Sequence, residues 1–158
     1  LANMSFGTKK GSQALADAVR NAAAAGLTMV AAAGNTSDPV LFPAAYPEVI
    51  AVGASDKKDV VPDWTARGPQ VAFAAPGVDI RSTKLNGNYE FKEGTSMSAP
   101  HVTGLVCLLM AARGVHGGEA VRAALKEAAT PLPGAPPQRQ GAGMVEGDKL
   151  VERGFYAR

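Results

Sequence analysis

A turn of small residues followed by an apolar segment constrains the fold more than any other part of the sequence. Residues 94–104 read Gly-Thr-Ser-Met-Ser-Ala-Pro-His-Val-Thr-Gly, and residues 102–112 carry no charged side chain. Thr95 is expected to cap a helix here, and Pro100 to lie in its first turn, where a missing N–H costs little. The pattern predicts a long apolar helix with Ser96 at its positively polarised end.

A serine in this position is suited to nucleophilic chemistry. The free N–H groups at the start of a helix, together with the helix dipole, stabilise negative charge that develops on a bound molecule. The alternative is that Ser96 merely belongs to the first turn of an ordinary core helix. The eleven-residue length of the motif favours the chemical interpretation over this structural one.

The rest of the chain alternates helices and strands, which indicates an α/β fold with a mostly parallel sheet flanked by helices in three layers. Ser12 is expected to cap a helix that runs to Ala25, with Gly26 ending it. The other expected elements are strands over 27–33, 49–54 and 71–75, a hairpin of 82–85 with 89–92, helices over 119–128 and near 148–152, and loops over 56–59 and 131–137.

A second segment complements the serine turn. Residues 29–35 read Met-Val-Ala-Ala-Ala-Gly-Asn, a short apolar strand that ends in glycine and asparagine. An Asn35 side-chain amide can supply one donor to an oxyanion, while a backbone N–H near Ser96 supplies another. The alternative is an asparagine that only accommodates a left-handed turn after the strand, and the pairing with the serine motif makes that interpretation the weaker one.

These motifs resemble those of the subtilisin-like serine protease family. Residues 94–97 and 100–102 stand as the family has them, and the collinear similarity continues through residues 3–7, 46–54, 75–77 and 80–83, so that it covers nearly the whole chain. The resemblance implies a serine endopeptidase with Ser96 as the acyl-accepting nucleophile and Asn35 as the oxyanion donor.

The resemblance also implies positions that contact a substrate. Ser5, Phe6 and Gly7 would form an edge that pairs with an extended substrate backbone, and small residues suit such close approach. Ala32, Ala33 and Gly34 would wall the pocket for the side chain that precedes the scissile bond. For each of these six residues, plain core packing is an equally good interpretation.

The histidines do not follow the order of the family. An activated serine needs a base and a carboxylate that orients the base, and the family carries them in the order aspartate, histidine, serine. His101 and His116 both follow Ser96, and no aspartate stands in the aspartate motif of the family. His101 is expected to be structural, and His116 to lie at the far end of the helix. Residues 1–158 are therefore interpreted as the C-terminal part of a catalytic domain, with the Asp- and His-bearing half missing.

Two classes of function stay open from the sequence. The first is a serine endopeptidase that is inactive alone and needs a complementary N-terminal half, a protein or peptide substrate and, by resemblance, a propeptide. The second is a non-catalytic pseudoprotease that acts as a binding or assembly module. The family resemblance favours a secreted, extracellular protein. A net charge of +2, without a basic run, gives no support to nucleic-acid binding, and no span is expected to cross a membrane.

No cofactor is expected for the chemistry, and no metal-ligand residues are assigned. The resemblance brings structural calcium into consideration, with a weaker cation site on backbone oxygens of residues 43–49. Because carbonyl ligands leave no side-chain signature, the interpretation without an ion is preferred. Cys107 is the only cysteine, which rules out a disulfide within the chain, and it is expected to be a small core residue.

Overall fold

The fold is built on a central six-stranded sheet. The structure, a computed structural model, describes residues 1–150. The sheet has the spatial order β1 (Ala2–Met4), β2 (Met29–Ala32), β3 (Val49–Ser55), β4 (Val71–Pro76), β8 (Met144–Val145) and β7 (Ala129–Thr130). All neighbours pair in parallel except β7 with β8. The expected mostly parallel sheet is confirmed.

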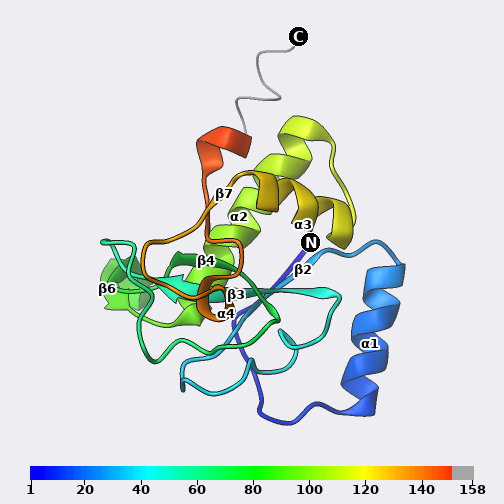
Figure 1. The fold of residues 1–158 in the computed structure, drawn as a ribbon, viewed down its shortest axis with the longest axis horizontal. Helices are drawn as coiled ribbons and strands as arrows, with labels where there is room; N and C mark the ends of the chain where they lie inside the picture. Colours follow the sequence, from blue (N-terminus) through cyan, green and yellow to red (C-terminus); the bar gives the residue numbers. More distant parts are fainter. Residues whose placement is uncertain (151–158) are drawn as a thin grey trace.

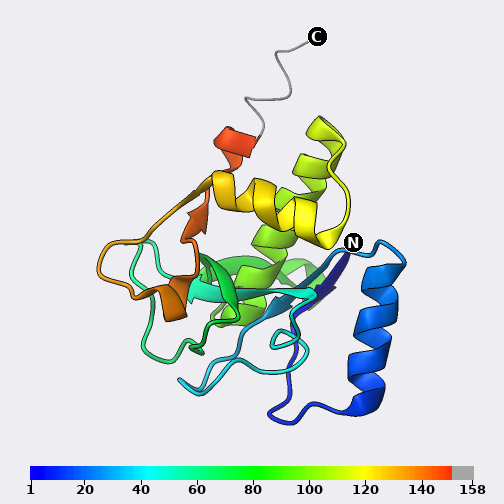
Figure 2. The ribbon, with the colours of Figure 1, turned by 45° about the vertical axis from the view of Figure 1, so that its right-hand side comes forward.

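Helices cover both faces of this sheet, which gives three layers (Figures 1 and 2). One face carries α2 (Thr95–Arg113) and α3 (Gly118–Glu127), and the other carries α1 (Gln13–Ala24). The short α4 (Pro137–Gln140) packs against β3 and β4. A separate antiparallel hairpin of β5 (Ile80–Lys84) and β6 (Asn88–Lys92), joined by the 3₁₀ turn η1 (Leu85–Gly87), leads into α2.

The two-residue period of the strands explains the two helical layers. Along β2, Met29 and Ala31 join the core cluster that contains Val19 of α1, whereas Val30 and Ala32 join the cluster that contains α2 and α3. Successive strand residues point to opposite faces, so a strand that is buried throughout must be apolar on both. All four residues of β2 are buried, which is why its sequence is a continuous apolar run.

Most of the expected elements are confirmed, with boundaries shifted by a few residues. Ser12 is the N-cap of α1, where its Oγ accepts a hydrogen bond from Leu15 N at 3.2 Å, and Gly26 follows the helix with φ +84°. The expected strand over 27–33 is shorter, since only Met29–Ala32 pair with β3, and only Met29, Val30 and Ala31 of these also pair with β1. Residues 147–150 are helical, and the rest of the expected terminal helix lies outside the described residues.

The start of α2 differs from the expectation in two respects. Gly94, not Thr95, is the N-cap, and it has φ +134° and no side-chain capping bond. Pro100 lies inside the helix as its sixth residue, so the first-turn placement was wrong. The Thr95 side chain is unavailable as a cap because it is buried in a contact with another segment, which is described below.

One face of α2 is exposed, although the helix is apolar. Ala99, Val102, Val106 and Leu109 are buried against the sheet. The opposite stripe is exposed and consists of Gly104, Cys107, Leu108 and Ala111. Cys107 was expected in the core, and this was wrong, because its position on the helix turns it away from the sheet.

Helix α2 also bears on the expectation about membrane spans. Among the described residues it is long and apolar enough to cross a membrane, so the sequence-based statement that no span qualifies was wrong. Its contacts with β1, β2, β3 and β4 are those of a core helix. Length and composition alone do not separate these two types of helix.

Gly77 is required where the β4–β5 connection passes under the serine turn. A methyl group there would overlap Ser98 Oγ and lie 2.7 Å from Ala54 Cβ. Gly94 N donates to Gly77 O at 2.8 Å, and Gly77 N donates to Ser55 O at 2.9 Å. The backbone of residue 77 therefore has no room to retreat from the added methyl group.

We expect Gly77→Ala to lower the free energy of unfolding by about 1–3 kcal/mol, the usual cost of overpacking a core. Gly104→Ala is the matched control, because it adds the same methyl group to α2 with no atom within 4 Å. The control should leave stability unchanged or raise it by up to about 1 kcal/mol. Urea denaturation measures both, and equal effects would contradict the close contact at Gly77.

Candidate functional site

Asn35 connects the end of β2 to the start of α2. Its Oδ1 accepts hydrogen bonds from Thr95 N at 2.9 Å and from Thr95 Oγ1 at 2.8 Å. Thr95 Oγ1 in turn accepts from Gly34 N at 3.0 Å. Thr95 is fully buried and Asn35 is exposed, so the bond to Gly34 is shielded from water and the two bonds to Asn35 are partly shielded. Together these bonds fix the two segments to each other. The two residues that the sequence pairs, Asn35 and Ser96, are thus brought to one place.

Two hydrogen-bond donors near Ser96 are unused within the described residues, the Asn35 Nδ2 group and the Ser96 N–H. Because Oδ1 takes both donors of Thr95, Nδ2 is the free end, and it lies 2.9 Å from the position that a methyl group on Gly94 would occupy. The Ser96 N–H, at the second position of α2, has no backbone acceptor among residues 1–150. The site therefore presents one side-chain N–H₂ and one helix-terminal N–H near the same serine.

Ser96 and Ser5 exchange two hydrogen bonds. Ser96 Oγ donates to Ser5 O at 3.1 Å, and Ser5 Oγ donates to Ser96 O at 2.8 Å. The second bond has a local cause. In a regular helix the N–H of residue 100 would bond to the carbonyl of residue 96, but Pro100 has no N–H. Ser5, which directly follows β1, supplies the missing donor.

Two further side chains hold Ser5 in this position. Asn3 Nδ2 donates to Ser5 Oγ at 3.0 Å, and Thr103 Oγ1 donates to Asn3 Oδ1 at 2.9 Å. Thr103 lies two turns along α2 from Ser96. The edge strand and α2 are therefore joined by a chain of side-chain hydrogen bonds that ends at the Ser96 carbonyl.

One of the residues expected to wall a pocket, Gly34, lies next to the side chain of Leu41. Ala32, Ala33 and Gly34 are all buried. A methyl group added at Gly34 would lie 2.9 Å from Leu41 Cγ, and one added at Gly7 would lie 2.8 Å from Leu41 Cβ. Leu41 Cδ1 is 3.1 Å from both of these positions, so the leucine side chain lies between the two glycines.

Phe6 and Gly7 continue the chain beyond edge strand β1. Both are exposed, and the Phe6 side chain keeps 63% of its surface accessible. Within the part of the chain that the structure describes, strand β1 pairs only with β2, which leaves its outer edge open. Ser5 differs from Phe6 and Gly7, because it is half-buried and its carbonyl already accepts a hydrogen bond from the Ser96 hydroxyl.

Neither histidine contacts the Ser96 hydroxyl. His101 is exposed on α2, where its Nδ1 lies 2.8 Å from Met97 O. His116 lies in the connection between α2 and α3, beyond the far end of a 19-residue helix. The structure therefore places the two histidines where the sequence analysis expected them, away from the reacting end of Ser96.

The carbonyls considered for a cation do not fit one well. Arg122 Nη2 donates to Pro47 O at 3.0 Å and to Val49 O at 2.9 Å. Burial lowers the pKa of Arg122, an effect that nearby Glu119 opposes. A second cation beside this half-buried guanidinium would be repelled. Among the described residues, no three His, Cys, Asp or Glu side chains gather in a group that could hold a metal.

Sequence reasoning missed three parts of this site. Thr95 was expected as a cap and instead binds Asn35, Leu41 had no motif to mark it, and the hydroxyl of Ser5 supports the serine turn. Pro100 was the available signal for the last of these, because a proline inside a helix leaves a carbonyl that needs another donor.

We expect Thr95→Val to lower the free energy of unfolding by about 1–3 kcal/mol, because it leaves the buried Gly34 N–H without its acceptor and removes a donor to Asn35. Thr95→Ser keeps the hydroxyl and should retain most of the stability. Chemical denaturation of both variants measures the difference. A small loss in Thr95→Val together with a large loss in Thr95→Ser would mean that the methyl group, and not the hydrogen bonds, matters.

Comparison with known proteins gives consistent matches. The sequence profile of the subtilase family, Peptidase S8, matches residues 1–143. The chain is 42% identical over 111 residues to the minor extracellular protease Epr of Bacillus subtilis, covering 69% of this chain and 17% of the relative. It is 35% identical over 151 residues to the thermostable alkaline protease of Halalkalibacterium halodurans, covering 95% and 41%.

A third relative, subtilisin E of Bacillus subtilis, is 38% identical over 135 residues, covering 82% of this chain and 35% of the relative. The chain thus spans less than half the length of each of these relatives. The profile match covers almost all of the described fold, including the strand that ends at Asn35 and the helix that begins beside Ser96. The chain belongs to the subtilase family of subtilisin-like serine proteases.

Proposed function

We propose that the protein is a serine endopeptidase in which Ser96 is the nucleophile and Asn35 stabilises the oxyanion. The observation that carries this proposal is the pair of hydrogen bonds from Thr95 to Asn35 Oδ1, at 2.8 and 2.9 Å. They hold the asparagine beside the serine turn while its Nδ2 stays free to donate. Family membership supports the same reaction class.

The proposed reaction has two steps. Ser96 Oγ forms a bond to the peptide carbonyl carbon while a base takes its proton, and the carbonyl electron pair moves onto oxygen. Asn35 Nδ2 and the Ser96 N–H donate to this oxyanion. The C–N bond then breaks as the protonated base donates to the leaving amine, and water hydrolyses the resulting ester by the same sequence.

The base and its orienting carboxylate are proposed to come from a complementary N-terminal half of the catalytic domain. In the described residues Ser96 Oγ donates to a backbone carbonyl, Ser5 O, which cannot accept a proton at neutral pH. The exposed apolar stripe of α2 and the open edge of β1 support a partner segment that packs there. A propeptide that binds before maturation is a further proposed partner.

The substrate is proposed to be a protein or peptide that binds in an extended form. Ser5, Phe6 and Gly7 continue the chain beyond β1, and an extended substrate backbone is proposed to pair with these three residues. Ala32, Ala33 and Gly34 are proposed to line the pocket for the preceding side chain, where Leu41 lies beside Gly34. The proposed reaction of Ser96, Asn35 and the base uses no metal or cofactor. Structural calcium would not take part in this reaction. One relative is named as extracellular, which supports secretion.

The position of Leu41 supports a substrate with a small side chain before the scissile bond. The leucine lies in the space between Gly7 and Gly34, which would otherwise admit a large apolar side chain. The small residues 32–34 alone would allow a large apolar or aromatic side chain, and Leu41, which belongs to the stretch 36–42, narrows the proposed pocket.

We expect the isolated chain to resist labelling of Ser96 by a fluorophosphonate, and the chain mixed with its N-terminal half to be labelled. The reagent traps only an activated serine, and the base is proposed to lie in the other half. Mass spectrometry locates the label. Full-rate labelling of the isolated chain would refute the divided site, and an unlabelled assembled pair would favour the non-catalytic binding module.

Two variants accompany this experiment. Ser96→Ala should abolish labelling and hydrolysis in the assembled pair. Asn35→Ala should still be labelled but hydrolyse peptides more slowly; the loss of such a donor, measured in a subtilisin and hence in this family, costs about 10²–10³ in turnover. His101→Gln is the matched control, because this histidine is exposed on α2 and contacts only Met97 O in the described part of the chain.

We expect the assembled enzyme to cleave after alanine in preference to phenylalanine, and Leu41→Gly to reverse this order. Removing the leucine opens the space between the two glycines, and accommodating a large apolar side chain there is worth about 1.5–3 kcal/mol. The kcat/KM values for paired Ala and Phe peptides test it. Leu15→Ala, which changes a leucine of α1, should lower stability without changing the ratio. An unchanged ratio in Leu41→Gly would contradict the proposed pocket.

A further inference from the structure

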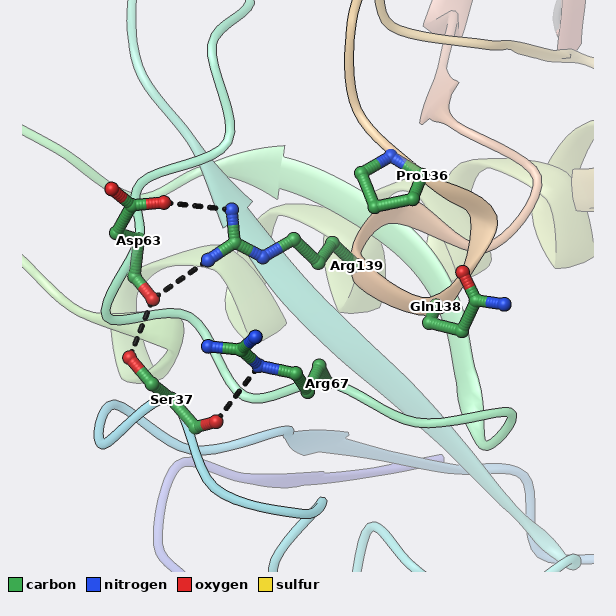
Figure 3. A pocket seen from close by; sticks show the side chains of 6 residues that line it. All are labelled: Ser37, Asp63, Arg67, Pro136, Gln138 and Arg139. Carbon is green, nitrogen blue, oxygen red and sulfur yellow. Dashed lines mark hydrogen bonds and ion pairs between the residues drawn. The ribbon is translucent and has the colours of Figure 1, made fainter.

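A cavity separate from the serine turn is lined by two arginines. It has a volume of about 530 Å³ and lies where two loops meet the start of α4, with Ser37, Asp63, Arg67, Pro136, Gln138 and Arg139 around it (Figure 3). Figure 3 shows both guanidinium groups extending to the same side of the cavity, toward Asp63 and Ser37. Cavities of this size accommodate one or a few amino-acid side chains.

Arg139 places a positive charge at this cavity, and hydrogen bonds hold its guanidinium group in position. Its side chain is only 16% exposed, and its Nη1 and Nη2 donate to Asp63 Oδ1 and Asp63 O, each at 2.9 Å. Its Nε is buried without a hydrogen-bond partner among the described residues. The Asp63 side chain is 99% exposed, so the counter-charge of a mostly buried cation is free to rotate into water.

Arg67 is held in place from the opposite wall. Its Nε donates to Ser37 O at 2.9 Å, which fixes the base of the guanidinium. No acceptor is found for its Nη1 or Nη2 within residues 1–150. Asp38, the other nearby carboxylate, is paired with Lys9 at 3.0 Å. Arg67 therefore presents an oriented pair of N–H₂ groups to the cavity.

The loop that carries Ser37 is held by hydrogen bonds to residues 63–67. Ser37 has φ +57°, a left-handed conformation that costs energy for a residue other than glycine. Its N donates to Trp64 O at 2.8 Å, and its Oγ donates to Asp63 O at 2.6 Å. The strained conformation is thus stabilised by the residues around the cavity.

We propose that this cavity binds the carboxylate of an acidic residue in a polypeptide, with Arg67 and Arg139 as the binding groups. Planar guanidinium groups match carboxylates and phosphates through paired N–H···O bonds. Two arginines and one aspartate give the cavity a formal charge of +1, which balances a carboxylate but not a dianionic phosphate. The incoming carboxylate replaces Asp63 as the partner of Arg139.

The polypeptide nature of the ligand follows from the position of the cavity. Ser37 is two residues from Asn35, so their Cα atoms are at most about 7 Å apart. A chain whose carbonyl lies at Asn35 reaches the cavity within a few residues. The acidic residue would thus lie in the substrate itself, near the bond that is cut. This last step rests on the proposed peptidase function, whereas the binding of a carboxylate does not.

The test measures binding without turnover, in the Ser96→Ala variant of the natural full-length protein. Two peptides with blocked ends, acetyl-Ala-Ala-Glu-Ala-Ala-amide and its Gln counterpart, are titrated by calorimetry alongside inorganic phosphate. Fluorescence of Trp64, whose carbonyl is bonded to Ser37, reports binding at this place. The Glu peptide should bind about tenfold more tightly than the Gln peptide.

Two variants test the location of the site, and they are expected to change the affinity for the Glu peptide in opposite directions. Arg67→Gln should weaken binding of the Glu peptide about tenfold, whereas Asp63→Asn, which removes the competing carboxylate, should strengthen it about two- to fivefold. Arg20→Gln, an exposed arginine of α1, is the matched control and should change nothing. Equal binding of the two peptides, or no effect of either cavity variant, would overturn the proposal. Tighter binding of phosphate than of the Glu peptide would overturn its assignment to polypeptide carboxylates.

Binding is separable from catalysis in this design. If the Glu peptide binds but the assembled wild-type enzyme shows no peptidase activity, the cavity stands and the peptidase proposal fails. If the enzyme is active but the Glu and Gln peptides bind equally, the opposite conclusion follows.

Discussion

The contact between Asn35 and Thr95 is the interaction on which the site depends. It joins residues 60 positions apart, at the carboxyl end of one buried strand and the amino end of the central helix. The threonine hydroxyl accepts from Gly34 and donates to Asn35, so one buried side chain serves two segments. In a parallel α/β sheet, the carboxyl ends of strands and the amino ends of helices meet at the same edge. Here that general geometry is fixed by specific hydrogen bonds.

Backbone carbonyls also anchor two half-buried arginines, Arg122 and Arg139. Arg122 binds Pro47 O and Val49 O from α3, and Arg139 binds Asp63 O from α4. A guanidinium donates in several directions at once, so it can tie a loop to a helix without a buried carboxylate. Hydrogen bonds from a guanidinium to backbone carbonyls thus hold two loops to helices α3 and α4. The core clusters between the sheet and the helices consist of apolar side chains.

Local sequence patterns predicted the elements well, because each is specified within a short window. The Ser12 cap, the apolar run of β2 and the hairpin before the serine turn all depend on neighbouring residues. The serine and asparagine motifs could be paired because a known family shares both. Their detailed roles in the reaction remain proposals.

Features set by distant contacts could not be predicted in this way. Threonine is a residue type that often caps helices, but the Thr95 hydroxyl is hydrogen-bonded to Asn35, 60 residues away. Cys107 lies in an apolar run, yet only the direction of the sheet decides which side of α2 is buried. Leu41 lies between two glycines that are themselves 27 residues apart, and no periodicity encodes that arrangement. The short β7 and β8 owe their pairing to tertiary packing as well.

The proline within α2 has a consequence for the order in which the molecule assembles. The Ser96 carbonyl receives its hydrogen bond from Ser5, across 91 residues of sequence, in place of the donor that the helix itself lacks. Contacts of such long range close late in folding, because the loop entropy must be overcome first. The helix can form early from local hydrogen bonds, but its opening turn acquires its final geometry only when the edge strand has docked. A chain that is still partly unfolded therefore does not carry a positioned serine.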